Sequence, residues 1–489
     1  MFKIKLLIGL CVMLSTAIYG QDCNCKEEYE WVKKTFVEND AGYSYYLEKY
    51  GQQAIDFNNE KWEKEIINAK DIWQCSDLLN AWIQFYRKGH LNVAMADQKK
   101  ARPSDIKINV NAQADINIPR LTVDIDSFQV AIKDVKEDSF EGVWTNETYN
   151  VGIKKVNDGY VGFIISSKND QWKAGEIKFS FPSEKSSTKT SRYYMGNHAL
   201  MDKKFDPCVL IGNLYLKAFD IYWKRVSPVF AAETDMDIEI ELLNATYPFI
   251  KKIDSVTTVF RIPSFDNGYI TIIDSIVKSN HDLLVSTKNL IIDIRGNGGG
   301  ADRCYDAITP YLYTNPIRSM WVEFLSTPLN NSRYDWIIKL DGFTEKERQS
   351  FRDMQTKLKA NIGTYVNLTE SNQIFVIDTL PSVYHNPQKV AILIDGGNAS
   401  TAEQFILMAK QSTKVKLFGQ RTAGALDYSN LNNVESPSGN FKLFYATSRS
   451  YRIPNMAIDD YGIQPDYFMD ESIPPYRWIK FVTETMKTK

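Results

Sequence analysis

A short, β-branched apolar run followed by two glycines and a serine constrains the fold of this chain more than any other feature. Residues 390–395, Val-Ala-Ile-Leu-Ile-Asp, predict a buried core strand. Gly396 and Gly397 then predict a sharp turn, and residues 401–411 predict a helix. A buried strand that runs through a tight turn into a helix is typical of an α/β sheet.

Ser400 lies at the mouth of that predicted helix. A hydroxyl there lies beside unpaired backbone N–H groups and the positive end of the helix dipole, where developing negative charge is stabilised. The position therefore suits a serine nucleophile. The pattern Ser400-x-x-Glu403 also matches a capping box, in which the serine does no more than cap the helix.

The composition is that of an ordinary globular protein. The chain has 489 residues, of which 44% are hydrophobic and 24% charged, enough for two or three domains. The net charge is −2, and because no basic patch dominates, nucleic acid is not expected as the main partner.

The first twenty residues predict a secretory signal. Lys3 and Lys5 precede an apolar stretch at 6–14, and a cleavage zone follows at 17–20. The apolar stretch is too short for a stable membrane span, and no later stretch approaches the required length. We therefore expect a protein that is secreted or periplasmic, with an uncleaved N-terminal anchor as the alternative.

The cysteines fit an oxidising compartment. We expect one N-terminal cysteine to bridge to Cys75, and five unpaired thiols are the alternative. No second pair has zinc-finger spacing, so no metal site is expected. The cysteines outside the predicted signal are Cys23, Cys25, Cys75, Cys208 and Cys304.

The chain divides by pattern into three parts after residues 1–20. Residues 21–104 predict an N-terminal helical region, in which a helix from Asp71 to Tyr86 is expected to end at Gly89. Residues 105–245 predict an inserted β domain, because short strand patterns alternate with turns. Trp144, Trp172, Phe179 and Phe181 are the expected core of that domain. Residues 246–489 alternate strand and helix patterns and predict an α/β core.

A second strand, residues 289–294, runs into the glycine-rich stretch 296–301, with a helix predicted from Asp302 to Tyr313. Glycines let backbone amides approach a ligand closely, and a helix N-terminus suits an anion. Gly296-x-Gly298-x-x-Ala301 fits a dinucleotide fingerprint, with Glu323 as the candidate ribose ligand. The other interpretations are a loop of amide donors for an oxyanion and a tight turn without a ligand.

Four segments in order resemble the C-terminal processing (tail-specific) peptidases. The resemblance implies an α/β core of the ClpP/crotonase type, serine peptidase chemistry, polypeptide substrates and no cofactor, and it outweighs the dinucleotide interpretation. The segments are the glycine-rich motif at 289–299, Asn-Ala-Ser-Thr-Ala-Glu at 398–403, Gly-Gln-Arg-Thr-Ala-Gly at 419–424 and Tyr-Gly-Ile-Gln-Pro-Asp at 461–466.

The chain departs from that family in its expected base. Many members use a Ser–Lys dyad with the lysine just after the Thr-x-Gly turn, where this chain has Ala425, Leu426 and Asp427. Serine is a poor nucleophile at neutral pH without a base. The tricorn-like branch instead uses a histidine from an N-terminal helical region and an acid just before the Gly-x-x-Pro-Asp landmark.

His90 is the candidate base, because Gly89-His90 resembles the Gly-His motif of that branch. Of the other histidines, His281 and His385 lie in polar stretches that suggest the surface, and His198 lies in a turn of the β segment.

Asp459 is the candidate acid, 59 residues after Ser400, and Asp460 is the alternative. A carboxylate there would orient the imidazole and stabilise the imidazolium. The candidate oxyanion donors are the backbone N–H of Thr401 and that of Gly298 or Gly299. The predicted protein is an exported serine endopeptidase, and the alternative is a non-catalytic envelope binding protein that retains the fold.

Overall fold

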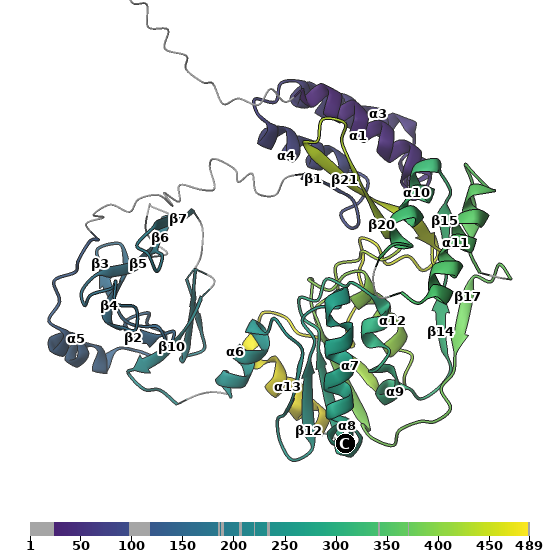
Figure 1. Ribbon diagram of the computed structural model, residues 1–489. Helices are drawn as coiled ribbons and strands as arrows, with labels where there is room; N and C mark the ends of the chain where they lie inside the picture. Colours follow the sequence, from purple (N-terminus) through teal and green to yellow (C-terminus); the bar gives the residue numbers. More distant parts are fainter. Residues whose placement is uncertain are drawn as a thin grey trace, which may run out of the picture. The chain divides into compact units, whose positions relative to one another are not determined.

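The computed structural model describes residues 24–96, 118–183, 186, 190–204, 208–219, 221–231, 235–340, 343–369 and 371–487. The predicted signal peptide and Cys23 lie outside these residues. Figure 1 shows the helices and strands of these residues. The chain divides into two compact units. The first comprises Met1–Gln98, Val322–Asn372 and Tyr428–Ser450, and the second comprises Lys99–Trp321, Gln373–Asp427 and Tyr451–Lys489. The domain boundaries expected from the sequence stay a prediction.

The first unit combines helices with an antiparallel sheet of order β1-β21-β15-β16, in which β20 also pairs with β21. Four of the five strands of this sheet, β15, β16, β20 and β21, therefore come from the C-terminal half of the chain, although they belong to the same unit as the N-terminal helices. The elements of this unit are α1 (Cys25–Asn39), α2 (Tyr43–Tyr50), α3 (Gln52–Ile67), α4 (Ile72–Ile83), β1 (Asn92–Met95), β15 (Val322–Leu325), α10 (Pro328–Ile337), α11 (Glu345–Lys359), β16 (Tyr365–Asn367), β20 (Tyr428–Glu435) and β21 (Phe441–Ser450).

A disulfide joins α1 to α4 through Cys25 and Cys75, with the two Cα atoms 5.7 Å apart. The expected bridge to Cys75 is confirmed, and Cys25 is its partner. The sequence separation is 50 residues. Closing a loop of that length lowers the conformational entropy of the unfolded chain, which stabilises the folded state by about 4 kcal/mol in the chain-entropy treatment.

Helix α4 ends at Ile83, so the expectation that the helix continues to Tyr86 and stops at Gly89 is wrong. After Ile83 the main chain forms tighter turns, in which the N–H of Phe85 donates to the Trp82 carbonyl and that of Tyr86 to the Ile83 carbonyl. The Asn80 side chain donates to the Val93 carbonyl at 2.5 Å and accepts the Val93 N–H at 2.8 Å, which ties β1 to the helix.

The second unit contains an all-antiparallel sheet of nine strands in the order β7-β6-β5-β4-β3-β2-β10-β9-β8. Trp144, Trp172, Phe179 and Phe181 are all buried in its core, as expected. The elements are α5 (Ile125–Ala131), β2 (Gly142–Thr145), β3 (Tyr149–Val156), β4 (Gly159–Ser167), β5 (Ile177–Pro182), β6 (Thr190–Tyr194), β7 (Leu200–Lys204), β8 (Val209–Ile211), β9 (Tyr215–Ala218) and β10 (Ile221–Ser227).

The second unit also contains a six-stranded sheet of order β11-β12-β13-β18-β19-β22, parallel except for β11. A separate antiparallel pair joins β14 to β17. The strands are β11 (Phe249–Lys252), β12 (Thr257–Arg261), β13 (Asn289–Asp293), β14 (Ile317–Met320), β17 (Phe375–Asp378), β18 (Lys389–Ile394), β19 (Val415–Gly419) and β22 (Tyr467–Phe468). The helices are α6 (Met236–Asn244), α7 (Ile270–Ser279), α8 (His281–Ser286), α9 (Thr309–Leu312), α12 (Thr401–Ala409) and α13 (Trp478–Lys487).

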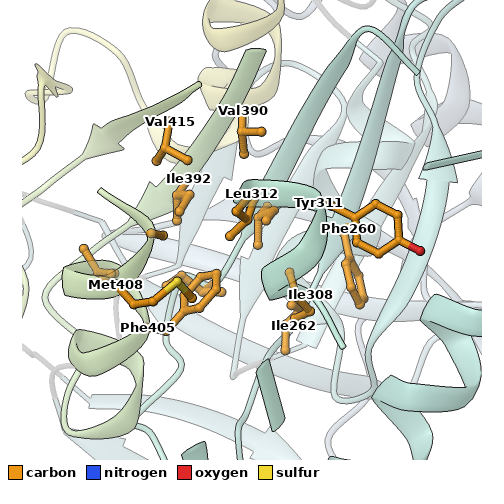
Figure 2. Packing of buried hydrophobic residues seen from close by; sticks show 14 of the residues in the cluster. Phe260, Ile262, Ile308, Tyr311, Leu312, Val390, Ile392, Phe405, Met408 and Val415 are labelled. Atoms are coloured by element: carbon orange, nitrogen blue, oxygen red, sulfur yellow. The ribbon is translucent and has the colours of Figure 1, made fainter. Parts of the chain in front are cut away.

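Both faces of the six-stranded sheet are covered, which explains the continuous apolar run of β18. Successive side chains of a strand point to opposite faces. Ile392 packs with Phe405 of α12 and with residues of α7 and α9 on one face (Figure 2). Leu393 packs with Leu242 of α6 and with residues of α13 on the other face.

The helix expected from Asp302 to Tyr313 is absent in that form. A 3-10 turn at Asp302–Tyr305 precedes the short α9, which begins at Thr309. Pro310 has no N–H to donate to an earlier carbonyl, so a continuous helix would be interrupted there. The glycine-rich loop therefore does not open directly into an α-helix. Within the described residues, no helix is long and apolar enough to cross a membrane.

Lys178 of β5 is fully buried inside the nine-stranded sheet's core. Its Nζ donates to the Tyr194 carbonyl at 2.5 Å and lies between 4.1 and 4.6 Å from the ring centres of Trp172, Tyr149 and Tyr193. Burial lowers the pKa of Lys178 to about 7. The aromatic faces and one carbonyl thus replace only part of the ammonium hydration.

We predict that Lys178→Met stabilises the protein at pH 8. The unfolded lysine binds a proton with its ordinary pKa of 10.5, whereas the folded lysine gives that proton up near pH 7. Wild-type stability should therefore rise relative to Lys178→Met as the pH increases from about 7 to about 10.5, and the difference should be constant above that range. Urea unfolding at several pH values measures this. The exposed Lys154 of β3, replaced by Met, is the control, and a pH-independent difference for Lys178→Met would contradict the prediction.

Candidate active site

Ser400 joins β18 to α12 in a backbone conformation that non-glycine residues rarely adopt, with φ 57° and ψ −124°. Its side chain does not cap the helix, so the capping-box interpretation is wrong for this serine. Thr401 is the first helical residue, and its N–H has no acceptor within the helix. Strained residues of this kind persist where the surrounding structure fixes them, and they cluster at functional sites.

Residues 395–400, which lead to the candidate nucleophile Ser400 and are called the nucleophile turn below, are fixed to the glycine-rich loop by two side chains. Asn398 is fully buried and donates to the carbonyls of Ile294 at 2.5 Å and Asn297 at 3.2 Å. Asp395 accepts the Gly296 N–H at 2.9 Å, and it also accepts the N–H of Gly397. Sequence reasoning did not assign a role to Asn398 or Asp395, although polar residues directly after a core strand were a signal for one.

The glycine-rich loop lies against the backbone of the nucleophile turn. A Cβ at Gly299, where φ is 99°, would lie 2.7 Å from the Ala399 carbonyl oxygen and 2.8 Å from the Thr401 nitrogen. The Gly299 N–H already donates to the Asn297 side chain at 2.9 Å. The Gly298 N–H has no acceptor among the residues that the structure describes. Of the two glycine amides considered from the sequence, Gly298 is thus the uncommitted one.

Glu403, on the first turn of α12, organises the segment next to Ser400. It is fully buried and accepts the Thr422 hydroxyl at 2.5 Å and the N–H groups of Gly424 and Ala425 at 2.8 Å. Burial raises the pKa of Glu403, and these hydrogen bonds oppose the rise. The Ala425 carbonyl in turn accepts the Ser400 N–H at 3.0 Å. The position of the lysine in the resembling family therefore holds a buried alanine, Ala425, whose carbonyl binds the Ser400 N–H.

The carboxylates of Asp459 and Asp427 each accept hydrogen bonds from the backbone segment that carries the other residue. The Asp459 Oδ1 accepts the N–H groups of Leu426 and Asp427, both at 2.6 Å. Asp427 accepts the Asp459 N–H at 2.8 Å and pairs with the Arg452 Nε at 2.8 Å. Asp459 is 9% exposed, whereas the alternative acid, Asp460, is exposed. Asp459 thus lies beside the segment that follows the Thr-x-Gly turn.

His90 belongs to the first unit and has φ 54°. Its Nδ1 lies 2.5 Å from the Tyr428 carbonyl oxygen, so this nitrogen carries the proton and donates it. Burial lowers the pKa of His90, and the nearby Arg87 guanidinium lowers it further, although the bond to Tyr428 opposes both. A neutral imidazole protonated on Nδ1 leaves Nε2 as a proton acceptor.

The other candidates from the sequence have structural partners. His281 and His385 are exposed, with Tyr311 and Gln388 as their respective hydrogen-bond partners. His198 packs against Trp172, with the ring centres 4.4 Å apart. Glu323, the ribose ligand of the dinucleotide interpretation, pairs with Arg449 at 2.6 Å in the first unit. Within the described part of the chain, no group of three or more potential metal ligands occurs.

The sequence profile of peptidase family S41 matches residues 257–469, which include both glycine-bearing turns and Asp459. This segment is therefore similar to the S41 peptidases. S41 enzymes are serine-type peptidases that act on polypeptides, so the match indicates a serine-type peptidase. No curated protein matches the chain significantly.

The chain is also similar to solved structures. The structure of mature CPAF complexed with lactacystin is 13% identical, over 95% of this chain and 97% of that chain, with a TM-score of 0.50. A putative peptidase from Parabacteroides merdae is 11% identical, over 96% and 98%, with a TM-score of 0.43. The tricorn protease is 11% identical, over 95% of this chain and 36% of that chain, with a TM-score of 0.39. The expected fold class, an α/β peptidase core with N-terminal helices and an all-β insert, is confirmed.

We predict that Gly299→Ala lowers the reaction of Ser400 with a fluorophosphonate probe by about a hundred-fold, because the added methyl would displace the nucleophile turn by a fraction of an ångström or more. The rate of labelling, followed by mass spectrometry, measures this. Gly396→Ala is the matched control, since the nearest atom to its Cβ is 4.0 Å away. Equal labelling rates in the two variants would show that Gly299 does not fix the position of Ser400.

Proposed function

We propose that the protein is an exported serine endopeptidase that hydrolyses peptide bonds of unfolded or tail-exposed proteins. Ser400 is the nucleophile, His90 the general base and Asp459 the acid. The S41 match supports the reaction class. The observation that carries the assignment of Ser400 is its strained backbone between β18 and α12. The neighbouring Thr401 N–H has no acceptor within the helix.

In the proposed reaction, the His90 Nε2 takes the hydroxyl proton as the Ser400 Oγ attacks the peptide carbonyl. The imidazolium then gives that proton to the leaving amine, and an acyl-enzyme remains on Ser400. Water, activated by the same imidazole, hydrolyses this ester and restores the serine. The N–H groups of Thr401 and Gly298 hold the oxyanion in both steps, and one such donor is typically worth about a hundred- to a thousand-fold in rate.

The environment of His90 supports its proposed role as a base. The Nδ1–H bond to Tyr428 selects the tautomer whose Nε2 accepts a proton. The lowered pKa keeps the ring neutral at physiological pH. Asp459 is proposed to stabilise the imidazolium that forms during the reaction, and its burial favours it over the exposed Asp460.

The proposal that the protein is exported rests on two observations. Residues 1–20 carry the pattern of a secretory signal. The Cys25–Cys75 disulfide fits an oxidising compartment, since such bonds are rare in the reducing cytosol. A secreted or periplasmic location is therefore part of the proposal.

We predict that the mature chain from Gln21 degrades casein and that Ser400→Ala and His90→Ala each lower turnover by about 10⁴-fold or more, because nucleophile and base act as one unit. Gel-based and fluorescent casein assays measure this, with thermal unfolding as the check on folding. Full activity in Ser400→Ala would refute the site, and full activity in His90→Ala would refute the base. A wild type without turnover would favour the non-catalytic binding protein.

Asp459→Asn tests the acid in the same assay, where we predict a loss of at least about a hundred-fold. The amide keeps one oxygen for the N–H groups of Leu426 and Asp427, so the local hydrogen bonds are largely retained. Asp460→Asn is the matched control. A larger loss in Asp460→Asn than in Asp459→Asn would reverse the assignment.

We predict that the acid limb of the kcat/KM profile has its midpoint below pH 6.5. The base must be neutral to accept the serine proton, and the pKa of His90 is lowered from 6.5, so His90 stays active to lower pH than an exposed histidine. Rates on a fluorescent casein between pH 4.5 and 8 measure this. A midpoint at or above 6.5 would contradict the assignment of this limb to His90.

A further inference from the structure

The backbone at His90 needs external support. Its φ of 54° lies in the left-handed region, which costs about 1–2 kcal/mol for a residue with a Cβ. Such a residue keeps its conformation only if neighbours hold it. The Tyr428 carbonyl fixes the ring through Nδ1, but it does not fix the main chain that carries the ring.

Arg87 supplies that support from three residues earlier. Its Nη2 donates to the His90 carbonyl at 3.0 Å, and its Nε donates to the Gly89 carbonyl at 3.0 Å. The same guanidinium forms a two-point ion pair with Asp40, with Nη1–Oδ1 at 2.7 Å and Nη2–Oδ2 at 2.5 Å. Arg87 is 2% and Asp40 1% exposed. One planar group thus binds a buried carboxylate and the two carbonyls of Gly89 and His90, which together are called the His90 turn below.

Asp40 extends the connection to the strands that carry Tyr428. Its Oδ2 also accepts the Ala446 N–H of β21 at 3.1 Å, and Ala446 pairs with Leu431 of β20. Strand β20 begins at Tyr428, whose ring lies under the Arg87 guanidinium at 5.1 Å. The ion pair therefore joins the main chain of His90 to the strand pair that supplies the acceptor for its ring.

The space around the pair is filled. A Cβ at Gly42 would lie 2.7 Å from the Arg87 Nη1, and the Gly42 N–H donates to the Asp40 Oδ1 at 2.8 Å. Gly42 has an ordinary helical backbone with φ −94°, so the lack of a side chain there reflects space and not conformation.

We propose that the Arg87–Asp40 ion pair is a positioning device that holds His90 in the orientation the proposed peptidase reaction needs. This inference rests on the proposed role of His90 as the base. Arginine is required because only a planar fork with five N–H donors reaches both Asp40 oxygens and two carbonyls at once. A lysine keeps the charge but not this geometry.

The test compares Arg87→Lys with Arg348→Lys. Arg348 of α11 is in the same unit and also binds two carbonyls, those of Ile338 and Leu340. In the described structure it has no hydrogen bond to the His90 turn or to Tyr428, so it controls for an arginine-to-lysine change. Two readouts are taken. Casein kinetics give kcat and KM, and spectra of the ¹⁵N-histidine-labelled protein give the tautomer and titration of the His90 ring, assigned through His90→Ala. The ring readout does not depend on peptidase activity.

We expect Arg87→Lys to lower kcat by about ten- to a hundred-fold with KM within about two-fold of wild type, since a misplaced base slows the chemical step. We also expect the His90 ring to lose its single Nδ1–H tautomer, whereas Arg348→Lys changes neither readout. If Arg87→Lys does not fold, Gly42→Ala replaces it, because its methyl displaces the guanidinium while both charges remain.

Wild-type kcat and an unchanged His90 ring in a folded Arg87→Lys or Gly42→Ala variant would overturn the proposal. A changed ring with wild-type kcat would also overturn it, because the position of His90 would then not matter to the reaction. If His90→Ala itself is fully active, the proposed role of His90 as the base fails instead, and the activity of His90→Ala separates that case from a failure of the positioning proposal.

Discussion

The parallel pairing of β13 with β18 is the constraint on which the candidate site depends. Ile292 lies opposite Ile392 and Asp293 opposite Leu393, so the two strands end at the same edge of the sheet. The glycine-rich loop and the nucleophile turn leave that edge together. Asn398 then joins them by donating to carbonyls of the loop, and this bond is strong because the amide is buried away from competing water. Without the register, neither the loop nor the turn would have a partner.

Buried charge near this edge is balanced within the second unit. The Arg295 Nη2 lies 2.6 Å from the Asp293 Oδ2, and the Arg261 Nη1 donates to the carbonyls of both residues. Removing one partner of such a group typically costs about 3–5 kcal/mol, because a charge is left buried without compensation. Glu403 differs, since the groups that bind its carboxylate among the described residues are neutral N–H and O–H groups. The charged group of Arg261, Asp293 and Arg295 fixes the start of the glycine-rich loop. Glu403 fixes the segment whose Ala425 carbonyl accepts the Ser400 N–H.

Much of the local structure was predictable from the sequence because its signals are local. The apolar run before Gly396 gave β18, and the aromatic residues of the β segment gave a buried core. Long-range effects account for the errors. Helix α4 ends before Tyr86 in a region where Asn80 bonds to the distant Val93, and Ser400 does not cap α12 although Glu403 follows at the right spacing. Membership of β20 and β21 in the first unit was not predictable, because strand pairing with β1 leaves no mark in either sequence alone.

The acid of a serine peptidase has two tasks, to select the imidazole tautomer and to stabilise the imidazolium, and in the proposed mechanism different groups perform them. The Tyr428 carbonyl already accepts the Nδ1–H, and a neutral acceptor is sufficient for the first task. A carbonyl carries only a partial charge, so it stabilises the imidazolium less than a carboxylate does. In the proposed mechanism Asp459 therefore contributes charge and not orientation. Orientation depends instead on the first unit alone, where Arg87 and Asp40 hold the main chain of His90 and Tyr428 holds its ring.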